Sequence, residues 1–214
     1  DYDFSRVGAT WRWQSDAARV AELPLPTLAG EQQLSNAAAA LMTLTSLRDR
    51  LPVAAAAIRA GLTQAWLPGR FQIVPGPVEW ILDVAHNPAA AAVLAHHLSH
   101  RACVGRTRAV LGLLADKDAD GVIQALAGVV DEWRPVTLAG VRGRTSADLA
   151  ARLRSAGIQA VSPHDDVASA WQAARADAEA GDRIVALGSF HVVAPVLAAQ
   201  PWIPDSALPP SRET

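Results

Sequence analysis

The 214-residue sequence predicts an α/β fold with a mainly parallel sheet. After Arg70 the chain alternates strand-like and helix-like segments several times, which is the pattern of layered α/β proteins. Half of the residues are hydrophobic, 19% are charged and the mean hydropathy is +0.14, which is typical of a compact globular protein and excludes a disordered chain. At this length we expect one or two domains.

Charge and cysteine content exclude several classes of protein. Lys and Arg total 19 against 21 Asp and Glu, so the net charge of -2 gives no overall field that favours nucleic acid or an anionic membrane. The single cysteine, Cys103, excludes an intramolecular disulfide and a thiolate metal cluster. No apolar run approaches the roughly 20 residues of a membrane span, and the opening lacks an export signal. We therefore expect a cytoplasmic protein that binds neither nucleic acid nor membrane.

The opening of the chain indicates the middle of a domain rather than its start. Residues 1–28 alternate loosely between apolar and polar side chains and contain two prolines near their end, which predicts short strands. The only methionine is Met42. We expect a fragment of a longer protein, in which residues 1–66 form the end of a first domain.

Two helices complete this first segment. Residues 31–50 are rich in Ala and Leu and contain neither Gly nor Pro, which predicts one long helix. A second helix is expected over 52–61, because Pro52 suits a first helical turn and Gly61 suits a helix end. Turn-forming residues follow, and we place a hinge at 67–71.

A second domain is expected over 72–204, followed by a flexible tail at 205–214. Its predicted strands are 71–74, 78–83, 109–114, 135–140, a weak 158–161 and 183–188. Its predicted helices are 88–100, 119–130, 146–156, 165–180 and 192–199. Thr145 and Asp148 form a capping-box pattern before one of these helices.

Polar side chains follow four of the predicted strands, at the sheet edge where parallel sheets bind ligands. Helix N-termini at this edge offer unpaired N–H groups and positive dipole ends. The polar residues are Asp83, His86, Asn87, Asp116, Lys117, Asp118, Arg142, Arg144, Ser189 and His191. Their concentration at one edge predicts a binding site but does not identify its ligand.

Seven of these residues also have a purely structural interpretation. Four of them are residue types that cap helices: Asp83, Asn87, Asp118 and Ser189. His191 taken alone is more often a packed or solvated histidine than a catalyst. Arg142 and Arg144 are of a type most often found as solvated surface charges.

Other chemistries find little support in the sequence. His96 and His100 have the spacing of zinc ligands on a helix, with His97 beside them, but no glutamate follows the first histidine and no further ligand is near in sequence. Ser189 and His191 are two residues apart and G-x-S-x-G is absent, so a catalytic triad is unsupported. Neither G-x-x-x-x-G-K-S/T nor G-x-G-x-x-G after the first strand is present, so the chain shows no triphosphate cradle.

Six runs along the chain point to one family. They are LSNAAAAL at 34–41, LPGRFQ at 67–72, ILDVAHNPAAA at 81–91, LGLLADKD at 111–118, TSADL at 145–149 and ALGSFHVVAPVL at 186–197. In this order they resemble the C-terminal part of the bifunctional dihydrofolate synthase/folylpolyglutamate synthase family, within the Mur ligase superfamily. Essentially the whole chain is covered by the resemblance.

The resemblance implies a P-loop ATPase domain, of which residues 1–66 would be the end, and a Rossmann-like C-terminal domain that closes over it. It implies an ATP-dependent amide ligase: a substrate carboxylate takes the γ-phosphoryl group, and the amine of L-glutamate attacks the acyl phosphate. Dihydropteroate and reduced folates would be the other substrates, and ATP and Mg²⁺ the cofactors. The metal ligands and a modified lysine would lie upstream, so the fragment would be inactive alone. The full-length protein would be a monomer.

The resemblance also implies roles for individual residues. Asn36 would contact adenine, Arg70 would reach the nucleotide phosphates from the hinge, and Asp83 would hold the ribose; these roles suit an amide, a guanidinium and a carboxylate. His86 would line the nucleotide or glutamate side of the cleft. The candidates for binding the glutamate carboxylates are Lys117, Ser189 and His191.

Two alternatives stay open. Another Mur-type ligase, which adds an amino acid to a cell-wall nucleotide precursor, would share the fold, although LPGRFQ and GSFHVV argue against it. A non-catalytic nucleotide-binding or protein-interaction module with a Rossmann-like fold is the alternative from a different class.

Overall fold

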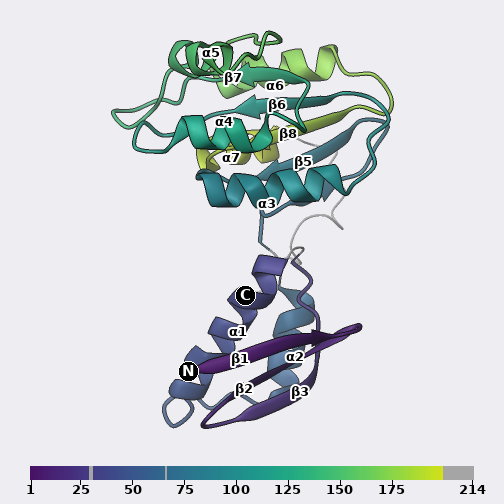
Figure 1. The fold of residues 1–214 in the computed structure, drawn as a ribbon, viewed down its shortest axis with the longest axis vertical. Helices are drawn as coiled ribbons and strands as arrows, with labels where there is room; N and C mark the ends of the chain where they lie inside the picture. Colours follow the sequence, from purple (N-terminus) through teal and green to yellow (C-terminus); the bar gives the residue numbers. More distant parts are fainter. Residues whose placement is uncertain (29–30, 66, 200–214) are drawn as a thin grey trace. The chain divides into compact units, whose positions relative to one another are not determined.

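The computed structural model describes residues 1–28, 31–65 and 67–199. It divides the chain into two compact units, Asp1–Leu67 and Pro68–Thr214, which we call unit 1 and unit 2 (Figure 1). The division falls at the start of the segment 67–71, where the sequence predicts a hinge. The predicted tail at 205–214 lies outside the described residues.

Unit 1 contains a three-stranded antiparallel sheet in the order β1-β2-β3. The strands are β1 (Tyr2–Val7), β2 (Thr10–Ser15) and β3 (Arg19–Pro24), which confirms the short strands predicted over 1–28. Trp11 and Trp13 on β2 are fully buried, because alternate side chains of a strand point to the same face. They pack with Leu23 and with two helices to form the core of this unit.

The helices of unit 1 are α1 (Glu31–Ser46) and α2 (Ala55–Gln64). The first is shorter than the predicted 31–50, because the last of these residues form turns. The second begins after Pro52 and passes through Gly61, so both predicted ends of the helix over 52–61 are wrong. One glycine costs a helix about 1 kcal/mol, and the alanine-rich sequence before it tolerates that cost.

Unit 2 contains a five-stranded sheet in the order β4-β5-β8-β6-β7. The strands are β4 (Gln72–Val74), β5 (Glu79–Asp83), β6 (Thr107–Leu111), β7 (Glu132–Pro135) and β8 (Arg183–Leu187). All neighbours pair in parallel except β4, which runs antiparallel to β5. The predicted α/β fold with a mainly parallel sheet is confirmed.

Helices cover both faces of this sheet, so unit 2 has three layers (Figure 1). The helices are α3 (Pro88–Ser99), α4 (Ala119–Leu126), α5 (Ser146–Ser155), α6 (Val167–Ala176) and α7 (Phe190–Ala198). The first three share a core with Ile81 and Val185 of the sheet. The last two share a separate core with Leu82 and Ile184, because neighbouring strand residues point to opposite faces.

Three predicted strands differ from those of the structure. The strand predicted over 135–140 is replaced by β7, which lies earlier in the chain and includes the charged residues Glu132 and Arg134. The third predicted strand, 109–114, begins earlier, at Thr107, and ends at Leu111. The weak strand expected over 158–161 is reduced to a single bridge between Trp133 and Val161.

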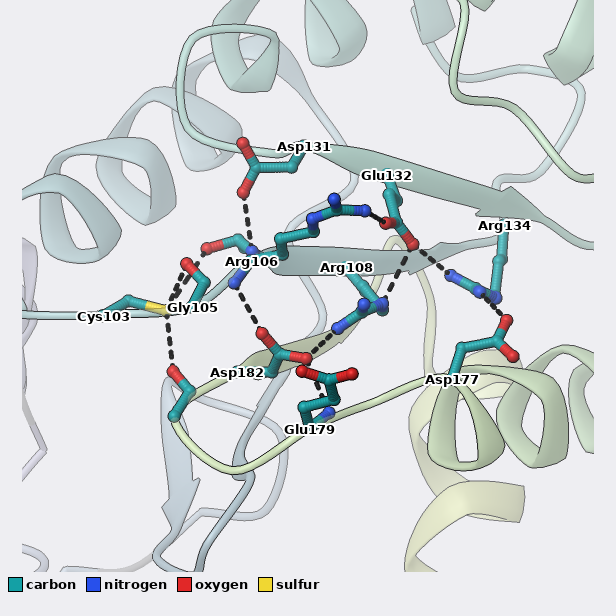
Figure 2. Close-up of polar contacts among 12 residues, drawn as sticks. Cys103, Gly105, Arg106, Arg108, Asp131, Glu132, Arg134, Asp177, Glu179 and Asp182 are labelled. Carbon is teal, nitrogen blue, oxygen red and sulfur yellow. Dashed lines mark hydrogen bonds and ion pairs between the residues drawn. The ribbon is translucent and has the colours of Figure 1, made fainter.

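Paired charges at the N-terminal ends of the strands explain why arginines occupy buried strand positions (Figure 2). Arg108 is 5% exposed and pairs with Asp182 and, at 2.9 Å, with Glu132. Arg134 is equally buried and places Nη2 2.5 Å from a carboxylate oxygen of Asp177. Both side chains of the Arg108–Asp182 pair are buried, so removing either partner would leave an uncompensated buried charge, whereas the Asp177 partner of Arg134 is 59% exposed.

Arg183, at the start of β8, joins the same edge of the sheet to the end of α3. Its side chain is 2% exposed and its Nε lies 2.9 Å from a carboxylate oxygen of Glu79. The guanidinium also donates to the carbonyl oxygens of Leu98, Arg101 and Ala102 at 3.2, 2.8 and 3.0 Å. Carbonyl groups at a helix C-terminus lack intrahelical partners, so Arg183 caps α3 from the sheet.

Candidate functional site

The opposite, C-terminal edge of the unit 2 sheet is where its connections diverge. Strand β8 lies between β5 and β6, with Leu187 opposite Asp83 on one side and Leu111 on the other. The chain leaves β5 and β6 toward helices on one face, whereas it leaves β8 toward α7 on the other face. Open α/β sheets bind ligands at such a switch point. The predicted residues that follow β5, β6 and β8 therefore share a candidate binding edge.

Asp83 ends β5 and uses both carboxylate oxygens. Oδ2 accepts from the backbone N–H of Phe71 at 2.8 Å, and Oδ1 accepts from that of Ala85 at 2.7 Å. Burial raises the pKa of Asp83 above its ordinary value, although these two hydrogen bonds and the nearby Arg70 charge act to lower it. The helix-cap interpretation of Asp83 is wrong, because Asn87 caps α3 by accepting from the N–H of Ala90.

The segment before β4 is tied to this same strand end. The carbonyl oxygen of Gly69 accepts from the N–H of Val84 at 2.9 Å, and the N–H of Gly69 donates to the side chain of Gln72 at 3.1 Å. Gly69 has a φ of +69°, and a Cβ atom there would lie 3.0 Å from Val193. Arg70 is half-buried in this segment, and among the described residues its guanidinium makes no hydrogen bond or ion pair.

Histidines lie close to this end of the sheet. The Nδ1 atom of His86 is 2.8 Å from the carbonyl oxygen of Val84. The ring of His97 meets that of Phe71 edge-on, with centroids 4.7 Å apart. Burial, helped by the neighbouring His96, holds the pKa of His97 below its ordinary value. Within the described residues, no group of three or more His, Cys, Asp or Glu side chains is arranged to hold a metal ion.

The loops after β6 and β7 are joined by backbone hydrogen bonds. The N–H of Ala115 donates to Arg142 at 2.8 Å, and the N–H of Arg144 donates to Leu113 at 3.2 Å. In the loop after β6, Lys117 places Nζ 3.2 Å from a carboxylate oxygen of Asp116. The loop that carries Lys117 is therefore fixed by hydrogen bonds to the loop after β7.

The Arg144 side chain holds the loop after β6 in place. The prediction that Arg144 is a solvated surface charge is therefore wrong. Its side chain is 11% exposed, and Nη2 donates to the carbonyl oxygens of Ala115 and Lys117 at 2.8 and 3.0 Å. Nη1 lies 2.5 Å from a carboxylate oxygen of Asp148, whose pKa it lowers. Arg142, by contrast, is 68% exposed, and within the described part of the chain the one ion pair of its side chain is with Asp116. The spacing of Arg144 and Asp148 on either side of a helix start was the sequence signal for this role.

The loop after β8 carries Ser189 and His191. The Ser189 hydroxyl oxygen accepts from the backbone N–H of His191 at 3.1 Å and caps α7, which confirms its capping interpretation. Asp118 caps α4 in the same way. His191 is exposed, as is Phe190, an aromatic side chain at the same edge that the sequence reasoning did not single out.

Asn36 belongs to unit 1 and lies on α1. Its amide nitrogen donates to the side chain of Gln33 at 3.1 Å. It lines a mostly apolar groove of about 360 Å³ between α1 and α2. The structure thus brings Arg70 and Asp83 together and keeps the other strand-end residues on one edge of unit 2, while Asn36 is described within unit 1 alone.

Comparison with known proteins adds a family to this geometry. The family described as "Mur ligase, glutamate ligase domain" matches residues 69–190. The dihydrofolate synthase/folylpolyglutamate synthase of Escherichia coli K12 is 40% identical over 197 residues, which cover 92% of this chain and 44% of that protein. The corresponding protein of Haemophilus influenzae is 34% identical, over 91% of this chain and 47% of its own length.

Solved structures give the same result. Escherichia coli FolC in complex with DHPP and ADP matches with a TM-score of 0.77 and 40% identity, over 92% of this chain and 45% of that one. A bifunctional folylpolyglutamate synthase/dihydrofolate synthase with Mn, AMPPNP and L-glutamate bound matches with the same TM-score, identity and coverage. The chain spans about half the length of the curated relatives that it matches.

Proposed function

Because the chain belongs to the Mur ligase family through its glutamate ligase domain, we propose that it is the C-terminal portion of a dihydrofolate synthase/folylpolyglutamate synthase. This enzyme would be an ATP-dependent amide ligase that adds L-glutamate to dihydropteroate and to folylpolyglutamates. The observation that carries the proposal is the match, over 92% of the chain, to a structure that holds a nucleotide analogue, a metal and L-glutamate.

The proposed reaction has two steps. A substrate carboxylate attacks the γ-phosphorus of ATP, which gives an acyl phosphate and releases ADP. The amine of L-glutamate then attacks the acyl carbon, phosphate leaves, and an amide bond remains. Both steps develop negative charge on phosphate oxygens, so positioned cations at the binding edge would stabilise them.

Arg70 and Asp83 fit the nucleotide. The Arg70 guanidinium makes no hydrogen bond to any described residue, so its donors are available to phosphate oxygens. Each carboxylate oxygen of Asp83 accepts one N–H and retains a lone pair for a ribose hydroxyl. Asn36 would contact adenine through its carboxamide, and His86 would line the same side of the site.

Lys117, Ser189 and His191 would bind the glutamate carboxylates. Lys117 supplies a positive charge, and its loop is held in place by the Arg144 guanidinium. The Ser189 oxygen already accepts a backbone N–H, which leaves its own O–H free to donate. The exposed His191 follows in the first turn of α7, where the helix dipole favours an anion.

We do not assign the Mg²⁺ ligands of the proposed enzyme to residues of this chain. Since the described residues offer no suitable group of ligands, we place the Mg²⁺ ligands in the upstream portion of the polypeptide and derive no step from this chain for them. No helix in the described part of the chain is long and apolar enough to cross a bilayer. We propose that the intact enzyme acts in the cytoplasm as a monomer, in folate biosynthesis and one-carbon metabolism.

The test uses the full-length polypeptide that contains this chain. With dihydropteroate, L-glutamate and ATP, we expect ADP release that depends on all three, and a product heavier by one glutamyl residue in mass spectrometry. The full-length gene should restore growth of cells that lack folate synthase. Turnover of a UDP-linked cell-wall precursor instead would identify another Mur-type ligase, and failure of both assays in a folded protein would favour a non-catalytic module.

A further inference from the structure

The segment Gly69–Phe71 is fastened to the end of β5 on both sides of Arg70. On one side, the Gly69 carbonyl oxygen accepts from the N–H of Val84 at 2.9 Å. On the other side, the N–H of Phe71 donates to Asp83 at 2.8 Å. Only Arg70 lies between these two anchors, so its backbone has little freedom to rotate.

Phe71 needs its anchor because its backbone is strained. It has a φ of +45°, in the left-handed region that residues with a Cβ atom rarely adopt. Such conformations persist only where the surroundings enforce them. Here the hydrogen bond to Asp83 and the contact between the Phe71 and His97 rings supply that enforcement.

Asp83 is itself held in place. Its other oxygen accepts from the N–H of Ala85 at 2.7 Å, and its backbone is paired in register with Leu187 of β8. One carboxylate therefore joins the segment before β4 to the turn after β5. Replacement of this carboxylate would release the Phe71 side of the segment while the Gly69 side stays bound to Val84.

We propose that Asp83 is a positioning residue, which sets the direction of the Arg70 side chain through the backbone N–H of Phe71. The role of Arg70 at the nucleotide phosphates rests on the proposed function. The structural half, that Asp83 maintains the conformation of Gly69–Phe71, is independent of it. The two halves therefore have separate tests.

The structural half is tested by amide hydrogen exchange, residue by residue, in the 214-residue chain. In Asp83→Ala we expect exchange at Phe71 to accelerate about tenfold or more, the scale of a lost hydrogen bond to a charged group, while Val84 keeps its protection. Asp166→Ala is the matched control, because Asp166 also accepts a backbone N–H, from Ser169, but at the start of α6. It should leave Phe71 unchanged. Unchanged exchange at Phe71 in Asp83→Ala would overturn the proposal.

A second variant keeps this test decisive if Asp83→Ala does not fold. Asp83→Asn is nearly isosteric and retains one acceptor oxygen, which can serve Ala85 or Phe71 but not both. We expect faster exchange at one of these two amides and a shifted Phe71 amide resonance. A spectrum in which both amides keep wild-type exchange rates would overturn the proposal.

The functional half is tested by a double-mutant cycle in the full-length ligase. If Asp83 acts on catalysis through Arg70, Asp83→Asn should lower kcat roughly tenfold in the wild-type background and should lower kcat little further in Arg70→Ala. The ribose contact proposed for Asp83 is independent of Arg70, so any rise in the KM for ATP should be the same in both backgrounds. Additive effects on kcat would overturn the functional half and leave Asp83 with its ribose contact alone. A wild-type polypeptide without ligase activity would instead reject the proposed function, and the exchange measurement would still decide the structural half.

Discussion

Gly188 lies so close to Gly112 that a Cβ atom on Gly188 would come within 2.3 Å of the Gly112 carbonyl oxygen. The contact joins the ends of β8 and β6 at the switch point, next to a hydrogen bond of 3.2 Å from the Gly112 N–H to Leu187. Gly188 also has a φ of +103°, which strains any residue with a side chain. Only glycine therefore fits the point from which the loop to Ser189 begins.

We predict that Gly188→Ala lowers the free energy of unfolding by about 2 kcal/mol or more, because strain and overlap add. Urea unfolding followed by circular dichroism measures the change. Gly128→Ala is the matched control: a Cβ atom on Gly128 would have no atom within 4 Å and its φ is ordinary, so we expect a change within about 0.5 kcal/mol. Equal stability of the two variants would contradict the prediction.

Arg144→Lys should destabilise the loop that carries Lys117. A lysine ammonium cannot reproduce the fork that reaches Asp148 and two carbonyl oxygens, so we expect a loss of about 1 to 3 kcal/mol in unfolding free energy. In the proposed full-length ligase the KM for glutamate should rise. Arg142→Lys changes an exposed ion pair and should cost under about 1 kcal/mol. An unchanged KM for glutamate in Arg144→Lys would show that the Lys117 loop does not contribute to glutamate binding.

The buried charge cluster of Figure 2 should make the protein acid-sensitive. Burial acts to raise the pKa of Asp182, but the N–H groups of Glu179 and Arg106 and the Arg108 guanidinium outweigh it, so this pKa is lowered. A group with a lowered pKa in the folded state stabilises the protein fully above its unfolded pKa of about 4, and this contribution is lost as the pH falls through the lower folded value.

We therefore predict that Asp182→Asn is less stable than wild type at pH 7 and loses less stability on acidification. Urea unfolding at intervals from pH 7 down to about pH 3 tests this. The difference between the two proteins should shrink as the pH falls below the unfolded pKa of Asp182. Parallel stability curves over the whole range would show that Asp182 does not carry the acid response.

Arg70→Lys should lower kcat in the proposed full-length ligase more than it weakens ATP binding. The substitution keeps the positive charge but removes the bidentate donors that match phosphate oxygens. Steady-state kinetics and a separate calorimetric measurement of ATP affinity distinguish the two effects. A wild-type kcat would identify Arg70 as an ordinary solvated residue.

Local signals were sufficient for much of the fold. The cap of α5 at Thr145 was predictable because its partner, the N–H of Asp148, is three residues away. Apolar runs located β5 and β8, and polar residues after them located the binding edge. Strand β7 was misplaced because its charged residues are neutralised by partners distant in sequence, such as Asp177 beside Arg134. The local pattern of apolar and polar residues does not show which distant residue will form such an ion pair.

The same limit applies to the site. The residue types at the strand ends were predictable, but the contact of Asp83 with the Phe71 N–H was not, because it exists only when β4 folds back antiparallel on β5. The buried state of Arg144 likewise depends on the loop after β6, about thirty residues earlier in the chain. Tertiary contacts of this kind decide which polar residues act on a ligand and which hold the others.

Helix α3 is secured at both ends, by Asn87 at the binding edge and by the Arg183 guanidinium at the other. Its 12 residues span about 18 Å, so Arg183 is remote from any ligand held at the strand ends. A loosened C-terminus would nevertheless let the helix shift along the sheet and carry the Asp83–Asn87 turn with it. A genetic selection for defective enzyme should therefore recover substitutions at Arg183 together with those in the binding loops, and inspection of ligand contacts alone would misjudge their cause.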